Sequence, residues 1–176
     1  PVPYAGRLCH GGFVAAHVSV WGKIKKHIDY DKQLLITGHS LGGALAELSA
    51  AKLNNKHTQL SLVAFGKPNT FFKGFKKPLK LNGQLSVVAG SDVVARVPRI
   101  LYGPSKSQTM LYHANTGRDL LDPSPKFVRH DFVKNAKEAI TDHFMPEYEA
   151  RLTVYLSDLK KGKKKEEEAK PPLKVV

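Results

Sequence analysis

The segment GHSLG at residues 38–42, which fits the pattern G-x-S-x-G, constrains the fold more than any other feature. It lies between a short apolar run at residues 33–37 and an Ala- and Leu-rich stretch at residues 44–53. The local order is therefore strand, tight turn and helix. A turn this sharp favours Gly on both sides of the serine, with Gly43 after them, because side chains there would clash with neighbouring elements. The segment predicts a nucleophile elbow that exposes the Ser40 hydroxyl.

Two further apolar runs, residues 59–65 and 84–89, each end at turn residues and predict buried strands. Strands separated by helices or long connections favour a mostly parallel sheet flanked by helices. Ligand sites in such folds lie at the carboxyl ends of the strands. We therefore predict an α/β fold with Ser40 at its functional edge. A dinucleotide-binding fold is excluded by the absence of G-x-G-x-x-G, and a P-loop by the absence of Gly-Lys-Ser/Thr.

Helical spacing of apolar residues predicts an amphipathic helix over residues 13–28, with a buried face formed by Val14, Val18, Trp21, Ile24 and Ile28. Helices are also predicted over residues 133–140 and 145–159, the latter with Pro146 near its start. Residues 99–127 are rich in Gly, Pro, Ser and Asp, which indicates short strands and loops.

Length and charge indicate one domain with a tail. The 176 residues are 41% hydrophobic and can bury one core, which we place at residues 1–159. Residues 160–176 hold seven Lys and three Glu, so they supply +4 of the net charge of +13, and we predict that this tail is disordered. The basic body suits an anionic surface, phospholipid or nucleic acid, but equally serves solubility alone.

The single cysteine, Cys9, excludes an internal disulfide and is predicted to be a small buried residue. A single cysteine weakly favours an intracellular, reducing compartment. The lack of a signal peptide, in a chain that begins at Pro1 rather than Met, favours it in the same weak way. No His-Glu-x-x-His segment or other cluster has metal-ligand spacing, so neither a metal nor a cofactor is expected.

A serine nucleophile needs a general base, and the base needs an orienting carboxylate. In this type of fold the acid and then the histidine follow the serine along the chain. Asp92 is the best candidate acid because it directly follows the strand predicted at residues 84–89, although a turn or helix cap would also explain it. The other carboxylates after Ser40 that we considered lie in loops, where solvation explains them: Asp119, Asp122 and Asp131.

The candidate bases are His113, His130 and His143. We favour His143, which directly precedes the last predicted helix, where the last member of such a series is expected. Spacing alone does not decide between His143 and the pair of alternatives, His113 and His130. The backbone N–H of Leu41, at the start of the helix after the elbow, is predicted to face the oxyanion of a tetrahedral intermediate.

Four segments resemble the class 3, or fungal-type, lipase family over nearly all of residues 9–156. They are HGGF at residues 10–13, ITGHSLGGA at 36–44, AFGKP at 64–68, and the pair formed by DVVARVP at 92–98 with Asp142-His143. The resemblance implies an α/β-hydrolase fold and hydrolysis of acylglycerols or related lipid esters by Ser40, Asp92 and His143. It implies a lipid or small ester substrate and no nucleic acid.

Members of this family carry a strand with an oxyanion-hole hydroxyl residue and a lid helix before the HGGF-like segment, and this sequence starts too late to contain them. The fold expected here therefore lacks the N-terminal strands and the lid. The chain is then a fragment, or takes its second oxyanion donor from elsewhere, or has lost activity. The last case would make it a lipid- or partner-binding module with a hydrolase fold, and a peptidase or thioesterase is a further alternative.

Residues 71–77, FFKGFKK, mix aromatic residues with lysines. This composition is typical of a loop in peripheral contact with a lipid surface. It is equally typical of a loop anchored in the core with a solvated basic edge, because lysine stems often cover apolar surface, and we favour this second interpretation.

Overall fold

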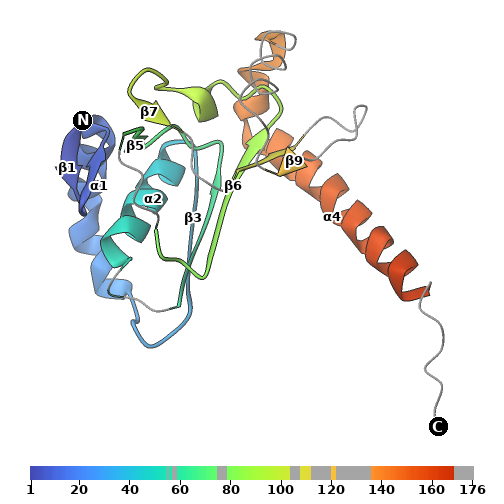
Figure 1. The fold of residues 1–176 in the computed structure, drawn as a ribbon, viewed down its shortest axis with the longest axis horizontal. Helices are drawn as coiled ribbons and strands as arrows, with labels where there is room; N and C mark the ends of the chain where they lie inside the picture. The colour runs from blue at the N-terminus through green and yellow to red at the C-terminus, as the bar shows by residue number, and fades with distance from the viewer. Residues whose placement is uncertain are drawn as a thin grey trace.

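A computed structural model describes residues 1–54, 56, 59–74, 79–103, 108–111, 120–121 and 136–168 (Figure 1). Its main sheet has the strand order β3-β4-β6-β8-β9. The pairs β3–β4, β4–β6 and β6–β8 are parallel, and β9 is antiparallel to β8. The mostly parallel sheet predicted from the sequence is confirmed. The strands are β3 (Leu34–His39), β4 (Leu60–Phe65), β6 (Gly83–Ala89), β8 (Gln108–Leu111) and β9 (Leu120–Leu121).

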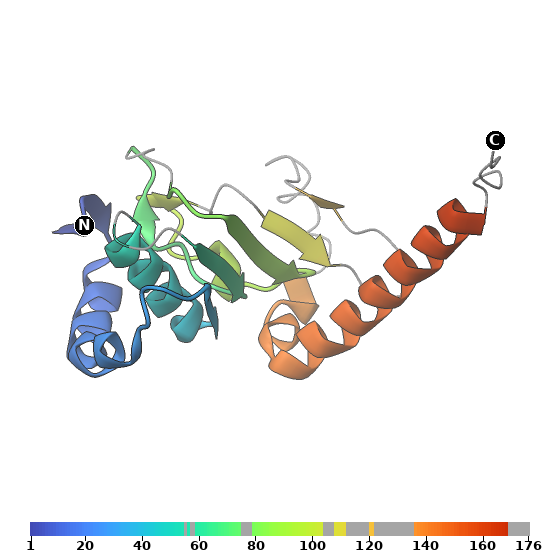
Figure 2. The ribbon, with the colours of Figure 1, turned by 90° about the horizontal axis from the view of Figure 1, so that it is seen from below.

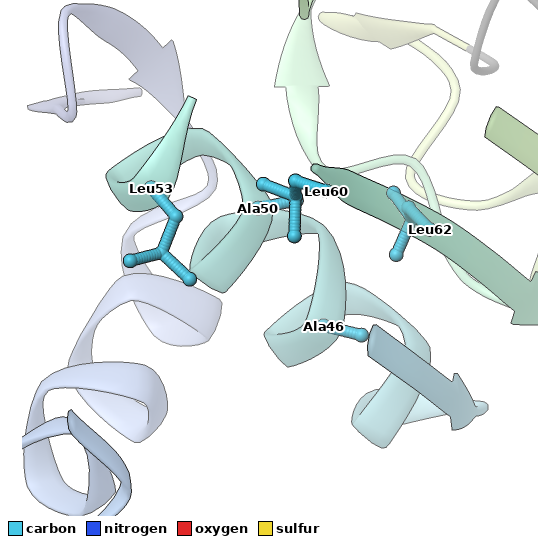
Figure 3. Close-up of a cluster of buried hydrophobic side chains, with 5 residues drawn as sticks. All are labelled: Ala46, Ala50, Leu53, Leu60 and Leu62. Carbon is cyan, nitrogen blue, oxygen red and sulfur yellow. The ribbon is translucent and has the colours of Figure 1, made fainter. Parts of the chain in front are cut away.

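Helix α2 (Leu41–Leu53) covers one face of this sheet. Its buried side chains Ala46 and Ala50 pack with Leu60 and Leu62 of β4, as Figure 3 shows. Successive residues of a strand point to opposite faces, so Leu60 and Leu62 share the α2 face and Phe65 lies on the other. Burial of these apolar side chains fixes the position of α2 against the sheet, and so holds the turn between β3 and α2 in place.

Helix α4 (Met145–Glu168) covers the opposite face. Its Tyr148 packs against Val87 and Ala89 of β6 and contacts Phe65, which is paired with Val87 in the β4–β6 register. The helix begins at the predicted residue and continues beyond residue 159, to Glu168, where the sequence had predicted a disordered tail. The run of lysines and glutamates at residues 160–168 has high helix propensity, and this end of the helix extends away from the body of the protein (Figures 1 and 2).

The first helix, α1 (Gly11–Ile24), ends earlier than predicted and is followed by a short 3-10 turn, η1 (Lys25–His27). Its predicted buried face is wrong in part, because Val18 is 57% exposed and Ile24 42% exposed. The residue that α1 buries fully is His17. The spacing of apolar residues carries no signal for a buried polar ring such as that of His17.

His17 is buried because both of its ring nitrogens have partners. Nε2 lies 2.9 Å from Ser49 Oγ, and Ser49 uses its own hydrogen to donate to the carbonyl of Leu45. His17 Nε2 must therefore donate to Ser49, and Nδ1 accepts a hydrogen bond from the Tyr4 hydroxyl at 2.7 Å. Burial, reinforced by the charge of Lys52, lowers the pKa of His17 to about 4. The ring is neutral and joins α1, α2 and the N-terminal strand.

This buried ring predicts a pH dependence of stability. The pKa of His17 is about 4 in the folded protein, below the ordinary value of 6.5, so the unfolded chain binds the proton more readily. The stabilisation is complete above pH 6.5 and is lost as the pH falls toward 4, by about 3 kcal/mol. Urea unfolding at a series of pH values should show a shallower dependence for His17→Gln than for the wild type. Equal slopes for the two proteins would contradict the assignment.

A second, antiparallel sheet with the order β1-β2-β5-β7 was not predicted. It consists of β1 (Val2–Tyr4), β2 (Arg7–Cys9), β5 (Phe71–Phe72) and β7 (Tyr102–Gly103). Cys9 is fully buried in it, as predicted, and burial raises the pKa of its thiol to about 11. Phe71 and Phe72 are half-buried in β5, with the Arg7 guanidinium over the Phe71 ring, so both aromatics belong to the sheet.

The remaining described segments are short. Turns of 3-10 helix occur at η2 (Val94–Arg96), η3 (Ala136–Glu138) and η4 (Thr141–His143). Of the helix predicted over residues 133–140, residues 136–138 form η3 and residues 139–140 form a turn. Residues 133–135 lie outside the described part of the chain. None of the described helices has both the length and the apolar character needed to cross a bilayer.

Candidate active site

The turn between β3 and α2 has the geometry of a nucleophile elbow. Ser40 has φ 55° and ψ −128°, a conformation that costs a non-glycine residue roughly 1–3 kcal/mol. Both of its backbone polar groups are bonded, because its N–H donates to Phe65 O at 3.0 Å and its carbonyl accepts from Gly43 N at 3.0 Å. The strained residue is thus fixed at the carboxyl end of β3, at the position predicted for the nucleophile.

The glycines around Ser40 have different reasons to be glycine. A Cβ on Gly38 would lie 2.8 Å from Gly43 N and closer still to the Gly42 carbonyl, and a Cβ on Gly43 would lie 2.7 Å from Lys67 Cβ. A Cβ on Gly42 would meet no atom within 4 Å. The prediction that both flanking glycines avoid a clash holds for Gly38 and is wrong for Gly42.

Ser40, His143 and Asp92 form a hydrogen-bonded chain. His143 Nε2 lies 2.8 Å from Ser40 Oγ, and His143 Nδ1 lies 3.0 Å from each carboxylate oxygen of Asp92. The three residues come from the end of β3, the turn after β6 and the end of η4. The Asp92 side chain is fully buried and the His143 side chain is 17% exposed. With Asp92 on Nδ1, the His143 ring presents Nε2 to the serine hydroxyl as a proton acceptor.

The Asp92 carboxylate is held by three donors besides His143. Its Oδ1 accepts from Val94 N at 2.8 Å and Ala95 N at 3.3 Å, and its Oδ2 accepts from the Tyr148 hydroxyl at 2.5 Å. Burial, and then the Asp92 charge, raise the pKa of Tyr148 above its ordinary value, so the hydroxyl keeps its proton and donates. The role of Tyr148 was not predicted from the sequence. The sequence signal that could have indicated it is a tyrosine, which has a polar hydroxyl on an aromatic ring, one turn into α4 and shortly after His143.

A buried ion pair anchors the loop that carries His143. Asp142 accepts hydrogen bonds from Ser91 N, at 2.7 Å, and from the Arg151 guanidinium on α4. Arg151 also reaches Glu147, at 3.5 Å. Burial raises the pKa of Asp142, and the Ser91 N–H and Arg151 oppose that shift. The pair ties the loop to the turn after β6 and to α4, and thereby holds the next residue, His143, over Asp92.

Two glycines with positive φ allow these side chains to approach the backbone. A Cβ on Gly66, which has φ 53°, would lie 2.6 Å from Asp92 Oδ2 and 2.8 Å from the Tyr148 hydroxyl. A Cβ on Gly90, which has φ 39°, would overlap Arg151 and Asp142. No larger residue fits at either position without displacing the groups around the triad.

A second buried ion pair lies behind the elbow. Lys67 Nζ and a Glu47 carboxylate oxygen are 2.8 Å apart, with side chains only 3% and 2% exposed. Glu47 lies one turn along α2 from Gly43, and Lys67 follows β4, so the pair joins the first turns of α2 to the end of β4. Arg7 also interacts electrostatically with Glu47. No role for any of these three residues was predicted from the sequence.

Leu41 N–H is the first amide of α2. Such an amide has no acceptor within its own helix, which leaves it available to a ligand. Its role toward an oxyanion is still a prediction. The other candidate residues lie outside the described part of the chain: His113, His130, Asp119, Asp122 and Asp131. Among the described residues, no group of three or more His, Cys, Asp or Glu side chains could hold a metal ion.

A parallel sheet covered by helices on both faces, with a strained serine between strand and helix, defines an α/β-hydrolase fold. The sequence model of the family described as Lipase (class 3) matches residues 3–102. The chain therefore belongs to the class 3 lipase family.

Individual relatives agree with this assignment. A secreted mono- and diacylglycerol lipase of Fusarium solani is 34% identical over 108 residues, which cover 56% of this chain and 32% of that protein. Lipase II from Rhizopus niveus superposes with a TM-score of 0.57 at 20% identity, covering 77% of this chain and 57% of its own. A triacylglycerol lipase whose catalytic centre is described as a serine protease triad gives 0.55 at 20% identity, covering 81% and 59%. The chain thus spans about a third of the Fusarium relative.

Proposed function

We propose that the protein is a serine hydrolase that cleaves carboxylic esters of lipids through an acyl-enzyme. The observation that carries this proposal is the hydrogen-bonded chain from Ser40 through His143 to the buried Asp92, set on a strained elbow. A serine hydroxyl is a weak nucleophile unless an oriented base takes its proton, and this arrangement supplies both the base and its orientation.

In the proposed mechanism, His143 Nε2 takes the proton of Ser40 as Oγ attacks the ester carbonyl carbon. Asp92 stabilises the imidazolium that forms, and the Leu41 N–H donates to the oxyanion of the tetrahedral intermediate. His143 then gives the proton to the leaving alcohol, and Ser40 is left as an acyl ester. A water molecule, deprotonated by His143, hydrolyses that ester and restores the serine.

Lipid esters are the proposed substrates. The Fusarium relative is a mono- and diacylglycerol lipase, and its match is the stronger support. The side chains next to the triad also favour an apolar substrate, because Leu41 follows Ser40 and is exposed, and Phe144 and Met145 follow His143 and are exposed. Exposed apolar side chains beside the reacting groups give an apolar ligand surface to bury.

Peripheral contact with a lipid surface is part of the proposal. Further exposed apolar residues follow Asp92 or precede His143, namely Val97, Ile100, Leu101 and Ile140. Together with Leu41, Phe144 and Met145 they would let the face that carries the triad meet a lipid surface, on which apolar side chains are buried in the interfacial layer. Phe71 and Phe72 are committed to β5, and residues 75–78 lie outside the described part of the chain.

Labelling with a fluorophosphonate ester, followed by mass spectrometry of the modified peptide, tests the proposal. We expect one modification, at Ser40, because only an activated serine attacks the phosphorus at an appreciable rate. Ser19→Ala is the matched control and should label as the wild type does, since Ser19 is exposed on α1 and donates to Ala16 O. An unlabelled but folded protein would overturn the proposal in favour of a binding module with a hydrolase fold.

A further inference from the structure

His39, the last residue of β3, contacts the base of the triad. It is not among the candidate bases, all of which follow the serine along the chain. In the structure its Nε2 lies 2.8 Å from the backbone carbonyl oxygen of His143. A carbonyl oxygen only accepts, so His39 Nε2 carries a hydrogen and donates it. The two imidazole rings are also stacked, with centroids 4.7 Å apart and an interplanar angle of 29°.

The same ring reaches the residue that holds the acid. Its edge packs against Tyr148, with centroids 5.7 Å apart at 69°, and Tyr148 donates to Asp92. One side chain therefore contacts the backbone of His143, the ring of His143 and the aromatic ring that supports Asp92. Its own backbone continues directly into Ser40.

This arrangement links the serine to the base through one short connection. Asp92 fixes the Nδ1 side of the His143 ring, and Asp142 holds the loop toward β6 and α4. Neither of these contacts ties the loop to β3, where Ser40 is fixed. The His39 hydrogen bond supplies that tie, because it runs from the residue next to Ser40 to the main chain of His143. A misplacement of about 1 Å between reacting groups costs a rate on the order of 10²-fold.

Resting on the proposed function, we infer that His39 is a positioning residue that sets the distance between Ser40 Oγ and His143 Nε2. It acts through its hydrogen bond to the His143 carbonyl and its stacking on the His143 ring. It moves no proton in the reaction and touches no substrate. The hydrogen bond and the stacking are separable by substitution, because phenylalanine keeps a flat ring without a donor and glutamine keeps an N–H donor without a ring.

The test compares the wild type with His39→Phe and His39→Gln in the full-length protein. The rate of fluorophosphonate labelling at Ser40, kcat and KM for a p-nitrophenyl ester, and the urea midpoint are measured for each. We expect His39→Phe to lower the labelling rate and kcat by about 10- to 100-fold with KM unchanged. We expect His39→Gln to recover most of that loss, to within about threefold of the wild type.

Other outcomes separate the two proposals. A wild type that is not labelled at Ser40 overturns the proposed function and this inference together. A labelled wild type with an equally labelled His39→Phe overturns the inference alone. So does a His39→Gln variant that loses as much rate as His39→Phe, because the donor would then not be what positions His143. A rate loss fully accounted for by the fraction of unfolded protein would reduce His39 to a structural role.

Discussion

Replacing Ser40 with alanine should lower kcat for ester hydrolysis by on the order of 10⁶-fold. The hydroxyl is the group that His143 Nε2 approaches at 2.8 Å, and Nδ1 of the same ring is held by the buried Asp92 carboxylate. Replacing Asp92 with asparagine should cost less, about 10⁴-fold, because the geometry survives while the histidine is held in the wrong tautomer. Initial rates on a soluble p-nitrophenyl ester measure both.

Stability measurements distinguish this loss of chemistry from a loss of fold. Ser40→Gly should be as inactive as Ser40→Ala. Its free energy of unfolding should nevertheless be about 1 kcal/mol higher than that of Ser40→Ala, since glycine accepts φ 55° without strain. Urea unfolding of the two variants gives the comparison. If Ser40→Ala kept more than a hundredth of the wild-type rate in a pure preparation, Ser40 would not be the nucleophile.

Replacing Lys67 with methionine should lower the free energy of unfolding by about 3–5 kcal/mol, because it leaves the buried Glu47 carboxylate without its main partner. Arg7 supplies part of the compensating charge, which favours the lower end of that range. The double variant with Glu47→Met should recover most of the loss, since an apolar pair of similar volume needs no desolvated charge. Denaturant unfolding of the two variants beside the wild type measures the effect.

An exposed ion pair provides the matched control for the Lys67 experiment. Lys32 and Asp29 are 3.0 Å apart, with side chains 79% and 46% exposed. Lys32→Met should cost about 1 kcal/mol or less, because water and salt already screen that pair. Equal losses at Lys32 and Lys67 would show that burial of the Lys67–Glu47 pair does not matter to stability.

The sequence predicted those parts of the fold that depend on local pattern. The strand, turn and helix around Ser40 are contiguous, and their apolar runs are long enough to show a period. The second sheet was missed because its strands are two or three residues long, and two of its three pairings join distant segments, as Cys9 does with Phe71 and Phe71 with Gly103. Such pairings leave no periodic signal in the sequence.

The triad residues could be chosen because the ends of parallel strands meet at one edge of a sheet, which brings the end of β3 close to the turn that holds Asp92. The residues that support the triad could not be chosen in this way. Tyr148 and Asp142 take their roles from contacts with the turn after β6, about fifty residues earlier in the chain, and Arg151 takes its role from its ion pair with Asp142. On sequence alone, Tyr148 and Arg151 are ordinary residues of a helix, and Asp142 stands out only as the neighbour of His143.

The placement of α4 makes the chemistry depend on the packing of one helix. His143 directly precedes this helix, and Tyr148 and Arg151 are part of it, whereas Ser40 lies at the end of β3 and leads into α2, which covers the opposite face of the sheet. A brief local opening that lifts α4 from Val87 and Ala89 would remove the base and the support of the acid together, and leave the serine in place but inert. The rate of turnover would then report the fraction of molecules in which α4 is packed against the sheet.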